Sequence, residues 1–311
     1  MPELPEVETV RAGLASLITG ATISAVEVRR DSCVRLLPGG AAEFAAAITG
    51  TTIRAVVRRG KFLWCELDSM EALSAHLGMS GQFRVHHGAV VPAPHSHCRA
   101  RLLLEVGSQT MTLDFLDQRT FGYLHAEPLI ATSDGLPGGQ GSDTAMVPAS
   151  VTHIARDALD PHLDPASAAM TMRRGSRGIK QVMLDQTVVA GIGNIYADEA
   201  LWMARLHPER PAHAVTSRQA TDLLAAAQDV MREALAQGGT SFDALYVNVN
   251  GESGYFSRSL HAYGRGGEPC ERCGRLLTRA SIGGRSTHWC SQCQRRWAAR
   301  GSRTARARGG T

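Results

Sequence analysis

The chain has 311 residues, 43% of them hydrophobic, so it can bury one large core or two to three smaller ones. It contains no run of eighteen apolar residues, which excludes a transmembrane helix. Its N-terminus, MPELPEVET, lacks the basic and apolar start of a secretory signal. We therefore expect a soluble, intracellular protein.

The net charge of +4 is distributed unevenly along the chain. Residues 258–311 hold 12 arginines and two acidic residues, whereas the remainder holds 21 basic and 27 acidic residues. A basic block of this density, which also contains aromatic residues, is typical of a segment that binds a polyanion such as nucleic acid. The alternative is a tail that only improves solubility.

The first 130 residues predict one helix followed by many short strands. Apolar residues recur at helical spacing from Val7 to Leu17, and Pro5 suits a first turn. Short strands joined by close turns favour a β-sandwich or barrel, and residues 1–135 are predicted to form an N-terminal β-sandwich domain. The clearest alternating segments are 23–28, 53–57, 62–67, 101–106 and 111–115, with turn signals at 58–60 and 107–108.

The second half of the chain predicts helices and a cysteine module, which makes the whole an α+β multidomain protein. Residues 136–148 are rich in Gly, Ser, Asp and Pro and predict a linker. Residues 149–255 predict a helical domain that ends in a polar loop from 240 to 255, with helical periodicity at 179–184, 195–206 and 217–236. The cysteine module spans residues 256–295, and residues 296–311 are expected to be a disordered, arginine-rich tail.

The cysteine module predicts one structural zinc ion. Two CxxC turns present four thiolates to a tetrahedral Zn²⁺, which leaves no open position for chemistry. Gly283 and Gly284 divide the intervening residues into two short strands, so we expect a zinc ribbon whose hairpin directs Arg285 towards DNA. Four of the seven cysteines form this C-x2-C-x16-C-x2-C unit: Cys270, Cys273, Cys290 and Cys293.

The N-terminus itself is a candidate nucleophile. Removal of Met1 would leave the secondary amine of Pro2 free, and an α-amino group has a pKa of about 8, against about 10.4 for lysine. Attack of this amine on a sugar C1′ would give a cationic iminium, which supports cleavage of the glycosidic bond and elimination of phosphate. Glu3 stands beside it as an acid or base. Because many proteins begin Met-Pro, this pattern alone does not decide the matter.

Two further features are weaker. Gly191–Asn194 leads into a predicted helix, and such a turn can bind a phosphate, although a plain interhelical turn has the same pattern. The basic ribbon favours phosphate binding. Lys61 and Lys180 are the only lysines beside 31 arginines, which hints that a lysine is retained where arginine cannot replace it.

Several motifs, in this order, resemble the formamidopyrimidine-DNA glycosylase family. The resemblance extends from residue 2 to residue 293 and implies an enzyme that excises oxidised purines from duplex DNA and then nicks the strand by β,δ-elimination. The motifs that carry it are Pro2–Thr9, Arg59–Phe62, His76–Gly81, Asp117–Gly122, Gly191–Glu199, Gly254–Phe256, Tyr263–Arg265 and the cysteine unit.

The resemblance implies a role for each candidate catalytic residue. Pro2 would be the Schiff-base nucleophile, and Glu3 would act as acid and base at the sugar with Glu6 in support. Lys61 would be the general acid of the lyase steps. Arg285 would hold a backbone phosphate and contribute to the second elimination.

It also implies a set of DNA-binding residues. Met79, Arg119 and Phe121 would enter the duplex to replace the extruded base, because a thioether, a guanidinium and a ring can fill that space and hydrogen-bond there. The loop from 240 to 255 would cover the flipped base. Further contacts are expected at His95, Lys180, Arg174, Asn194 and Tyr255.

Two alternatives stay open at this point. An endonuclease VIII-type enzyme for oxidised pyrimidines is related, but its terminus typically reads Pro-Glu-Gly-Pro, and Leu4 stands in the third place here. A non-catalytic zinc-ribbon DNA-binding protein would not need Pro2, Glu3 and Lys61 together. The expected partner is double-stranded DNA that contains oxidised bases, and the protein is expected to be a bacterial monomer associated with the nucleoid in the cytoplasm.

Overall fold

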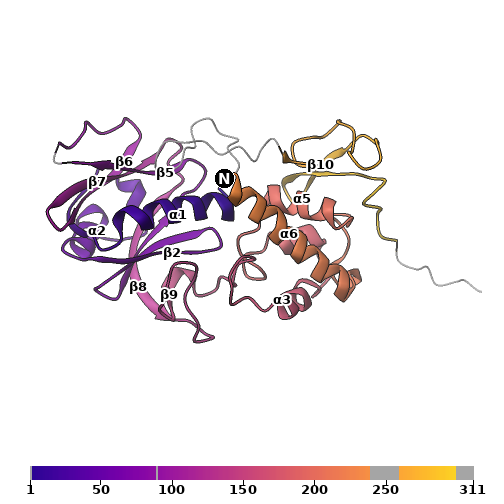
Figure 1. Ribbon diagram of the computed structural model, residues 1–311, viewed down its shortest axis with the longest axis horizontal. Helices are drawn as coiled ribbons and strands as arrows, with labels where there is room; N and C mark the ends of the chain where they lie inside the picture. The colour runs from indigo at the N-terminus through magenta and orange to yellow at the C-terminus, as the bar shows by residue number, and fades with distance from the viewer. Residues whose placement is uncertain (1, 89, 239–258, 299–311) are drawn as a thin grey trace, which may run out of the picture.

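The computed structural model describes residues 2–88, 90–238 and 259–298. A β lobe and a helical lobe lie side by side, and the N-terminus lies where they meet (Figure 1). The ribbon formed by the cysteine module packs against the helical lobe. The predicted order of a β-sandwich, a helical domain and a zinc ribbon is confirmed.

The β lobe consists of two antiparallel sheets that enclose an apolar core. One sheet has the strand order β1-β6-β7-β5 and the other the order β2-β3-β4-β8-β9. Alternate residues such as Leu102, Phe115 and Leu124 are buried between them, as the period-two pattern requires. The strands are Thr22–Val28 (β1), Ile53–Arg59 (β2), Phe62–Leu67 (β3), Glu71–His76 (β4), Gly81–His87 (β5), Cys98–Val106 (β6), Gln109–Asp117 (β7), Tyr123–Ala131 (β8) and Met146–Pro148 (β9).

Two helices accompany the sandwich. Helix α1 (Leu4–Ile18) begins at the predicted place, buries Val7, Val10 and Leu14, and extends from the β lobe to the junction of the lobes (Figure 1). Helix α2 (Gly40–Ile48) was not predicted, because only two of its residues, Phe44 and Ile48, are buried and no apolar period stands out.

The segment predicted as a linker belongs to the β lobe. Strand β9 pairs with β8 as the fifth strand of its sheet, and Gln140 forms an isolated bridge to Arg58. A Cβ on Gly139 would lie 2.3 Å from the Arg58 carbonyl oxygen, so this glycine serves close backbone packing. The glycine-rich composition therefore reflects contact with β2, and the β lobe extends to Pro148.

The helical lobe has its own core. Helices α4 (Ile179–Met183), α5 (Asn194–Met203) and α6 (Ser217–Ala236) confirm the three predicted helices, whereas α3 (Pro165–Met172), capped by Asp164, was missed. Among the residues that the structure describes, no helix combines the length and apolar character needed to span a bilayer.

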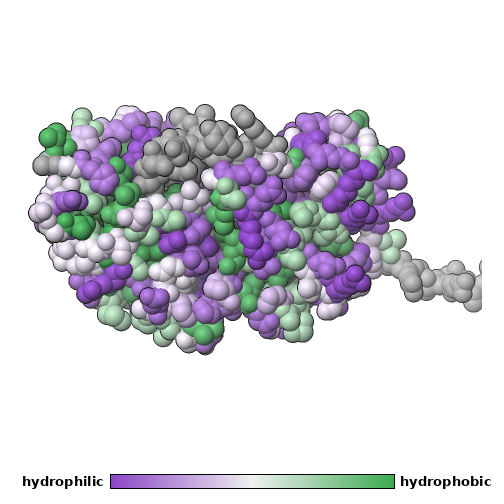
Figure 2. Space-filling model, viewed as in Figure 1, coloured by the Kyte–Doolittle hydropathy of each residue, from purple (hydrophilic) through white to green (hydrophobic). Residues whose placement is uncertain are grey.

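The ribbon is the predicted hairpin. Strands β10 (Thr278–Ile282) and β11 (Arg285–Trp289) are antiparallel, and Gly283 and Gly284 form the turn with φ angles of 59° and 75°, which suit glycine. Hydrophilic side chains gather over this part of the molecule at the upper right of Figure 2. This distribution agrees with the basic block expected from the sequence.

Lys180 joins the ribbon to the helical lobe. Its Nζ lies 2.6 Å from Asp198 Oδ1 and donates to Thr287 Oγ1 at 2.8 Å, and its side chain is only 1% exposed. The Asp198 carboxylate also accepts the His288 backbone N–H at 2.8 Å. A phosphate has no access to the ammonium in this structure. Lys180 is therefore an interior cation between α4, α5 and β11, which corrects the expectation of a phosphate contact.

This burial predicts a stability defect in Lys180→Met. The methionine keeps most of the volume but leaves the Asp198 carboxylate without its cation, which costs about 3 to 5 kcal/mol. Denaturant unfolding measures the loss, and Lys180→Met/Asp198→Asn should recover part of it because the uncompensated charge is gone. Wild-type stability of Lys180→Met would contradict the structural role.

Candidate active site

One cavity brings together three predicted catalytic residues from distant parts of the chain. Pro2, Lys61 and Arg285 line a cavity of about 150 Å³ where the two lobes and the ribbon meet. They come from the N-terminus, from the turn between β2 and β3, and from the first position of β11. Three residues to which the resemblance assigned roles in one reaction thus line one cavity of the folded chain.

Glu3 reaches from the β lobe to the N-terminus of helix α5. Its Oε1 accepts the Ile195 N–H at 2.9 Å and its Oε2 accepts the Tyr196 N–H at 3.4 Å, and the residue is 4% exposed. These N–H groups lack partners inside the helix, and the helix dipole favours a negative charge there. The end of α5 therefore holds the carboxylate that adjoins Pro2.

Glu6 caps the backbone at Glu3. The Glu3 backbone N–H donates to Glu6 Oε2 at 2.9 Å, which completes a capping box at the start of α1. The Tyr196 hydroxyl donates to the other oxygen, Oε1, at 2.8 Å. Glu6 thus fixes the backbone of the catalytic terminus to helix α5 and does not line the cavity.

The glycine turn before α5 accommodates the N-terminus of the chain itself. A Cβ on Gly193 would lie 2.1 Å from the Glu3 carboxyl carbon, and a Cβ on Gly191 would lie 2.4 Å from Leu4 Cδ1. The predicted function of this turn as a phosphate cradle is therefore wrong for the helix N-terminus. The glycines do permit a close approach, but the approaching anion is Glu3.

Burial shifts the pKa of Glu3 upwards. Removal of the carboxylate from water raises its pKa, Glu6 adds to the rise, and the Lys61 ammonium and the two α5 N–H bonds oppose it. A glutamic acid with a raised pKa can hold a proton nearer neutral pH, as a general acid must.

Lys61 is held at the tip of the β2–β3 turn. Gly60 precedes it with a φ of 59°, and the Lys61 ammonium donates to the Ile192 carbonyl at 2.9 Å. Burial is the largest cause of a lowered pKa at Lys61; the Arg285 cation adds to the lowering, and Glu3 opposes it. The proton of this lysine is therefore easier to remove than that of an exposed one.

The ribbon strand that carries Arg285 is attached to the first residue of α5. Asn194 Nδ2 donates to the Ser286 carbonyl at 2.8 Å, directly beside the exposed Arg285. Asn194 was predicted to contact phosphate. In this structure its side-chain amide orients the ribbon, and the arginine is the group that faces the cavity.

Two clamped turns present the residues expected to enter DNA. Asp117 accepts the Ser80 hydroxyl at 2.5 Å and the Gly122 N–H at 2.7 Å, which joins the turn at 77–81 to the turn at 117–122. Met79 and Phe121 are 40% and 56% exposed on these turns, a degree of exposure that core residues do not have. The arrangement suits apolar side chains that insert into a ligand.

The remaining predicted DNA contacts differ in what the structure shows. Arg119 is exposed, and its Nη1 lies 3.8 Å from Met79 Sδ. His95 and Arg174 are exposed on the surface. Tyr255 and the expected covering loop at 240–255 lie outside the described residues.

Two cavity residues were missed by the sequence interpretation. His76 stacks on Tyr123 with ring centroids 5.2 Å apart, and its pKa is lowered by burial and by the Arg35 and Lys61 cations. Its place at the start of a recognised motif was the available signal. Gln186 accepts the Gly191 N–H at 2.9 Å and donates to the Ile192 carbonyl at 3.1 Å, and a glutamine in a helical region gave no signal.

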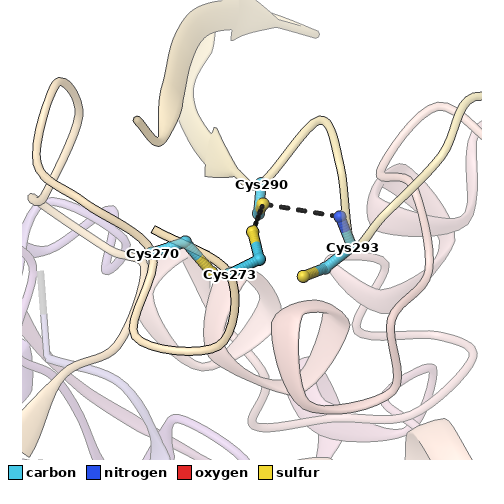
Figure 3. Close-up of side chains that lie close together, drawn as sticks. All are labelled: Cys270, Cys273, Cys290 and Cys293. Carbon is cyan, nitrogen blue, oxygen red and sulfur yellow. Dashed lines mark hydrogen bonds between the residues drawn. The ribbon is translucent and has the colours of Figure 1, made fainter. Parts of the chain in front are cut away.

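The four cysteines of the ribbon form a compact ligand set (Figure 3). Their sulfur atoms all lie within 4.8 Å of one another, and Cys273 Sγ is 3.5 Å from Cys290 Sγ. Zn–S bonds of about 2.3 Å in a tetrahedron require sulfur atoms about 3.8 Å apart, so the set fits one zinc ion. The Cys293 N–H points to Cys290 Sγ at 3.4 Å, a contact that stabilises a thiolate.

Three sequence-family models match the chain in the order of its structural parts. They are the formamidopyrimidine-DNA glycosylase N-terminal domain at residues 1–124, the H2TH domain of the same glycosylase at 154–244, and a zinc finger found in FPG and IleRS at 267–296. The fold and the site thus define a DNA glycosylase with abasic-site lyase activity that contains a zinc finger.

Named relatives and solved structures agree. The formamidopyrimidine-DNA glycosylase of Leifsonia xyli subsp. xyli is 51% identical over 298 residues, which cover 95% of this chain and all of the relative. The enzyme of that name from Mycobacterium avium is 50% identical over 297 residues, which cover 95% of this chain and 99% of the relative. The MutM (Fpg) protein of Thermus thermophilus superimposes with a TM-score of 0.75 at 35% identity, with 94% of this chain and 98% of that one covered.

A Lactococcus lactis Fpg in complex with DNA containing an abasic site superimposes with a TM-score of 0.76 at 29% identity, with 95% of this chain and 100% of that one covered. The chain belongs to the formamidopyrimidine-DNA glycosylase family. It is a base-excision repair enzyme for oxidised purines, and the relatives named above are bacterial proteins.

The close packing of Gly193 against the Glu3 carboxylate leads to a prediction for Gly193→Ala. Gly193 has a φ of −120°, which alanine adopts without strain, so any effect comes from the added methyl group against Glu3. We expect about a 100-fold loss of single-turnover rate with DNA binding retained, because displacement of a catalytic group by about 1 Å has this effect.

The matched control is Gly178→Ala. Gly178 also precedes a helix with an ordinary φ of −58°, and its nearest contact for a Cβ is 3.2 Å away. This variant should keep nearly the full rate. If the single-turnover rate of Gly193→Ala is within about twofold of the wild-type rate, the position of Glu3 at the N-terminus of α5 is not needed for catalysis.

Proposed function

We propose that this chain removes 8-oxoguanine and formamidopyrimidines from duplex DNA through an imine on Pro2, and then cleaves the strand by β,δ-elimination. The observation that supports this best is the cavity where Pro2, Lys61 and Arg285 meet beside the buried Glu3. A nucleophile, two proton-transfer groups and a phosphate-binding cation are the components that such a reaction needs.

The first step breaks the glycosidic bond. The Pro2 amine, free once Met1 is removed, forms a bond to C1′, and the electron pair of the C1′–N bond leaves with the base, which takes up a proton. Glu3 is placed next to Pro2, and its raised pKa lets it deliver a proton to the sugar ring oxygen as the ring opens. The product is a cationic iminium between Pro2 and C1′.

The following steps cleave the strand. The iminium draws electrons from C2′, so a proton is lost there and the 3′ phosphate leaves. A second elimination expels the 5′ phosphate, and hydrolysis returns the free amine. Lys61 has a lowered pKa and lies in the same cavity, so it can give and take these protons. Arg285 supplies a fixed positive charge for the departing phosphate.

The exposed turns would hold the duplex open. Met79 and Phe121 are apolar and exposed, and Arg119 extends beside Met79, so the three side chains can fill the space that the extruded base leaves. His95, Arg174 and Arg285 are exposed and can bind backbone phosphates. Tyr255 remains a proposed contact, as does Asn194 through the second N–H of its side-chain amide.

We also infer that the enzyme works as a monomer on DNA of the bacterial nucleoid in the cytoplasm. The bacterial origin of the named relatives and the DNA-bound Lactococcus lactis protein support this inference. The named relatives are all formamidopyrimidine-DNA glycosylases, so no observation favours the endonuclease VIII alternative or a non-catalytic DNA-binding protein.

Borohydride trapping tests the proposed nucleophile and acid together. Reduction during turnover of an 8-oxoguanine duplex should link DNA to the protein, and peptide mapping should place the adduct on residue 2. Lys61→Arg should still bind and trap the lesion but lose proton transfer, with a rate lower by about 100-fold, because arginine stays protonated. An adduct on Lys61, or full activity of Lys61→Arg, would contradict the assignment.

A further inference from the structure

A buried ion-pair network crosses the junction of the two lobes close to the active site. Arg58 of β2 is 2% exposed, and its Nη1 donates to Asp157 Oδ2 at 2.8 Å, while its Nε donates to Glu8 Oε2 at 2.8 Å. Glu8 in turn pairs with Arg11 at 2.8 Å. Two arginines and two carboxylates balance, so the network carries no net charge.

Asp157 binds the turn that presents Lys61. Its Oδ2 accepts the Gly60 N–H at 2.9 Å as well as Arg58, and Gly60 directly precedes Lys61. The same carboxylate accepts the Leu159 N–H through Oδ1 at 3.0 Å, and Asp157 is fully buried. The Asp157 carboxylate, which follows the β lobe in the chain, therefore holds both the Gly60 backbone in the turn and the Arg58 side chain at the base of the turn.

The segment around Asp157 also fixes the other contact of Lys61. Asp157 forms a parallel bridge to Ala190, and the Ala190 N–H and carbonyl are bonded to Arg156 and Ala158 at 3.2 Å each. Two residues further on, the Ile192 carbonyl accepts the Lys61 ammonium. The segment around Asp157 is therefore hydrogen-bonded both to the turn backbone before Lys61 and to Ala190, two residues before the acceptor of the Lys61 Nζ.

The network extends to the catalytic terminus as well. Glu8 lies in α1, two residues after Glu6, which forms the capping box with Glu3. Leu4, at the start of α1, donates its N–H to the Gly191 carbonyl at 3.2 Å. Arg58 is therefore bonded to the helix that directly follows Pro2 and Glu3, and also to the carboxylate that holds the turn of Lys61.

We propose that Asp157 is a positioning residue for Lys61. Through its contacts with the Gly60 N–H and Arg58, Asp157 holds the Lys61 side chain close to Pro2 and Glu3. The inference rests on the proposed role of Lys61.

A double-mutant cycle separates positioning from mere stability. Asp157→Asn keeps the size of the side chain but cannot accept at both oxygens. On a duplex with a preformed abasic site, it should slow single-turnover nicking by about 10- to 100-fold, with duplex affinity within about twofold of wild type. In the Lys61→Ala background, Asp157→Asn should slow nicking no further, because the group that it positions is absent.

The matched control is Asp114→Asn. Asp114 is equally buried and holds Arg101 by two hydrogen bonds of 2.6 and 2.7 Å, in the sheet away from the cavity. It should lower the stability by a similar amount and leave the nicking rate unchanged. If Asp157→Asn fails to fold, Arg58→Lys enters the same cycle, because a lysine cannot bind both Glu8 and Asp157 as the guanidinium does.

The outcomes are distinguishable. Equal slowing by Asp157→Asn in the wild-type and Lys61→Ala backgrounds, or no slowing at all, overturns the positioning role and leaves the proposed function intact. Full nicking activity of Lys61→Ala overturns the proposed role of the lysine and this inference together. Slow Lys61→Ala with no further effect of Asp157→Asn supports both.

Discussion

The contact on which the rest of the site depends is the Glu3 carboxylate at the N-terminus of helix α5. It places a residue from the start of the chain on the second lobe, with the Ile195 and Tyr196 N–H groups as its ligands. A buried carboxylate without hydrogen-bond partners costs free energy, so burial of Glu3 is favourable only when the lobes are together and α5 supplies its N–H groups. Pro2, the proposed nucleophile one residue earlier, is thereby confined to the junction, where Lys61 and Arg285 also lie.

The other interior charges follow from this arrangement. Helix α5 holds Glu3 at its start and Asp198 one turn later, and Asp198 meets Lys180 and β11. Asp157 and Arg58 join the lobes at the base of the Lys61 turn. The proposed catalytic groups therefore stand on elements that are joined to each other by buried polar contacts, and such contacts preserve the geometry of a site before substrate binds.

The parts that the sequence predicts well are those whose signal is local. The cysteine spacing determines the zinc ligands, the glycine pair determines the hairpin turn, and periodicity identifies α5 and α6. Lys180 and the helix N-terminus after the Gly191–Asn194 turn were expected to contact phosphate, and each has a partner within the chain for one physical reason. A cation or a helix N-terminus attracts any anion, and the sequence cannot tell a DNA phosphate from Asp198 or Glu3 of the same chain. No signal in the sequence indicated the role of Asp157, because its partners Arg58 and Gly60 are 99 and 97 residues away in the chain.

The most direct test of this account is the titration of Glu3 itself. Carbon-13 NMR of protein labelled in the glutamate carboxyl groups, with Glu3→Gln for assignment, gives the pKa of this one residue. Because burial outweighs the opposing Lys61 charge and the helix N–H bonds, Glu3 should keep its proton at a pH where exposed glutamates, with a pKa of about 4.3, have lost theirs. A Glu3 that titrates at or below that ordinary value would show that the helix N–H groups and Lys61 outweigh burial, and Glu3 could not hold the proton that the proposed reaction needs.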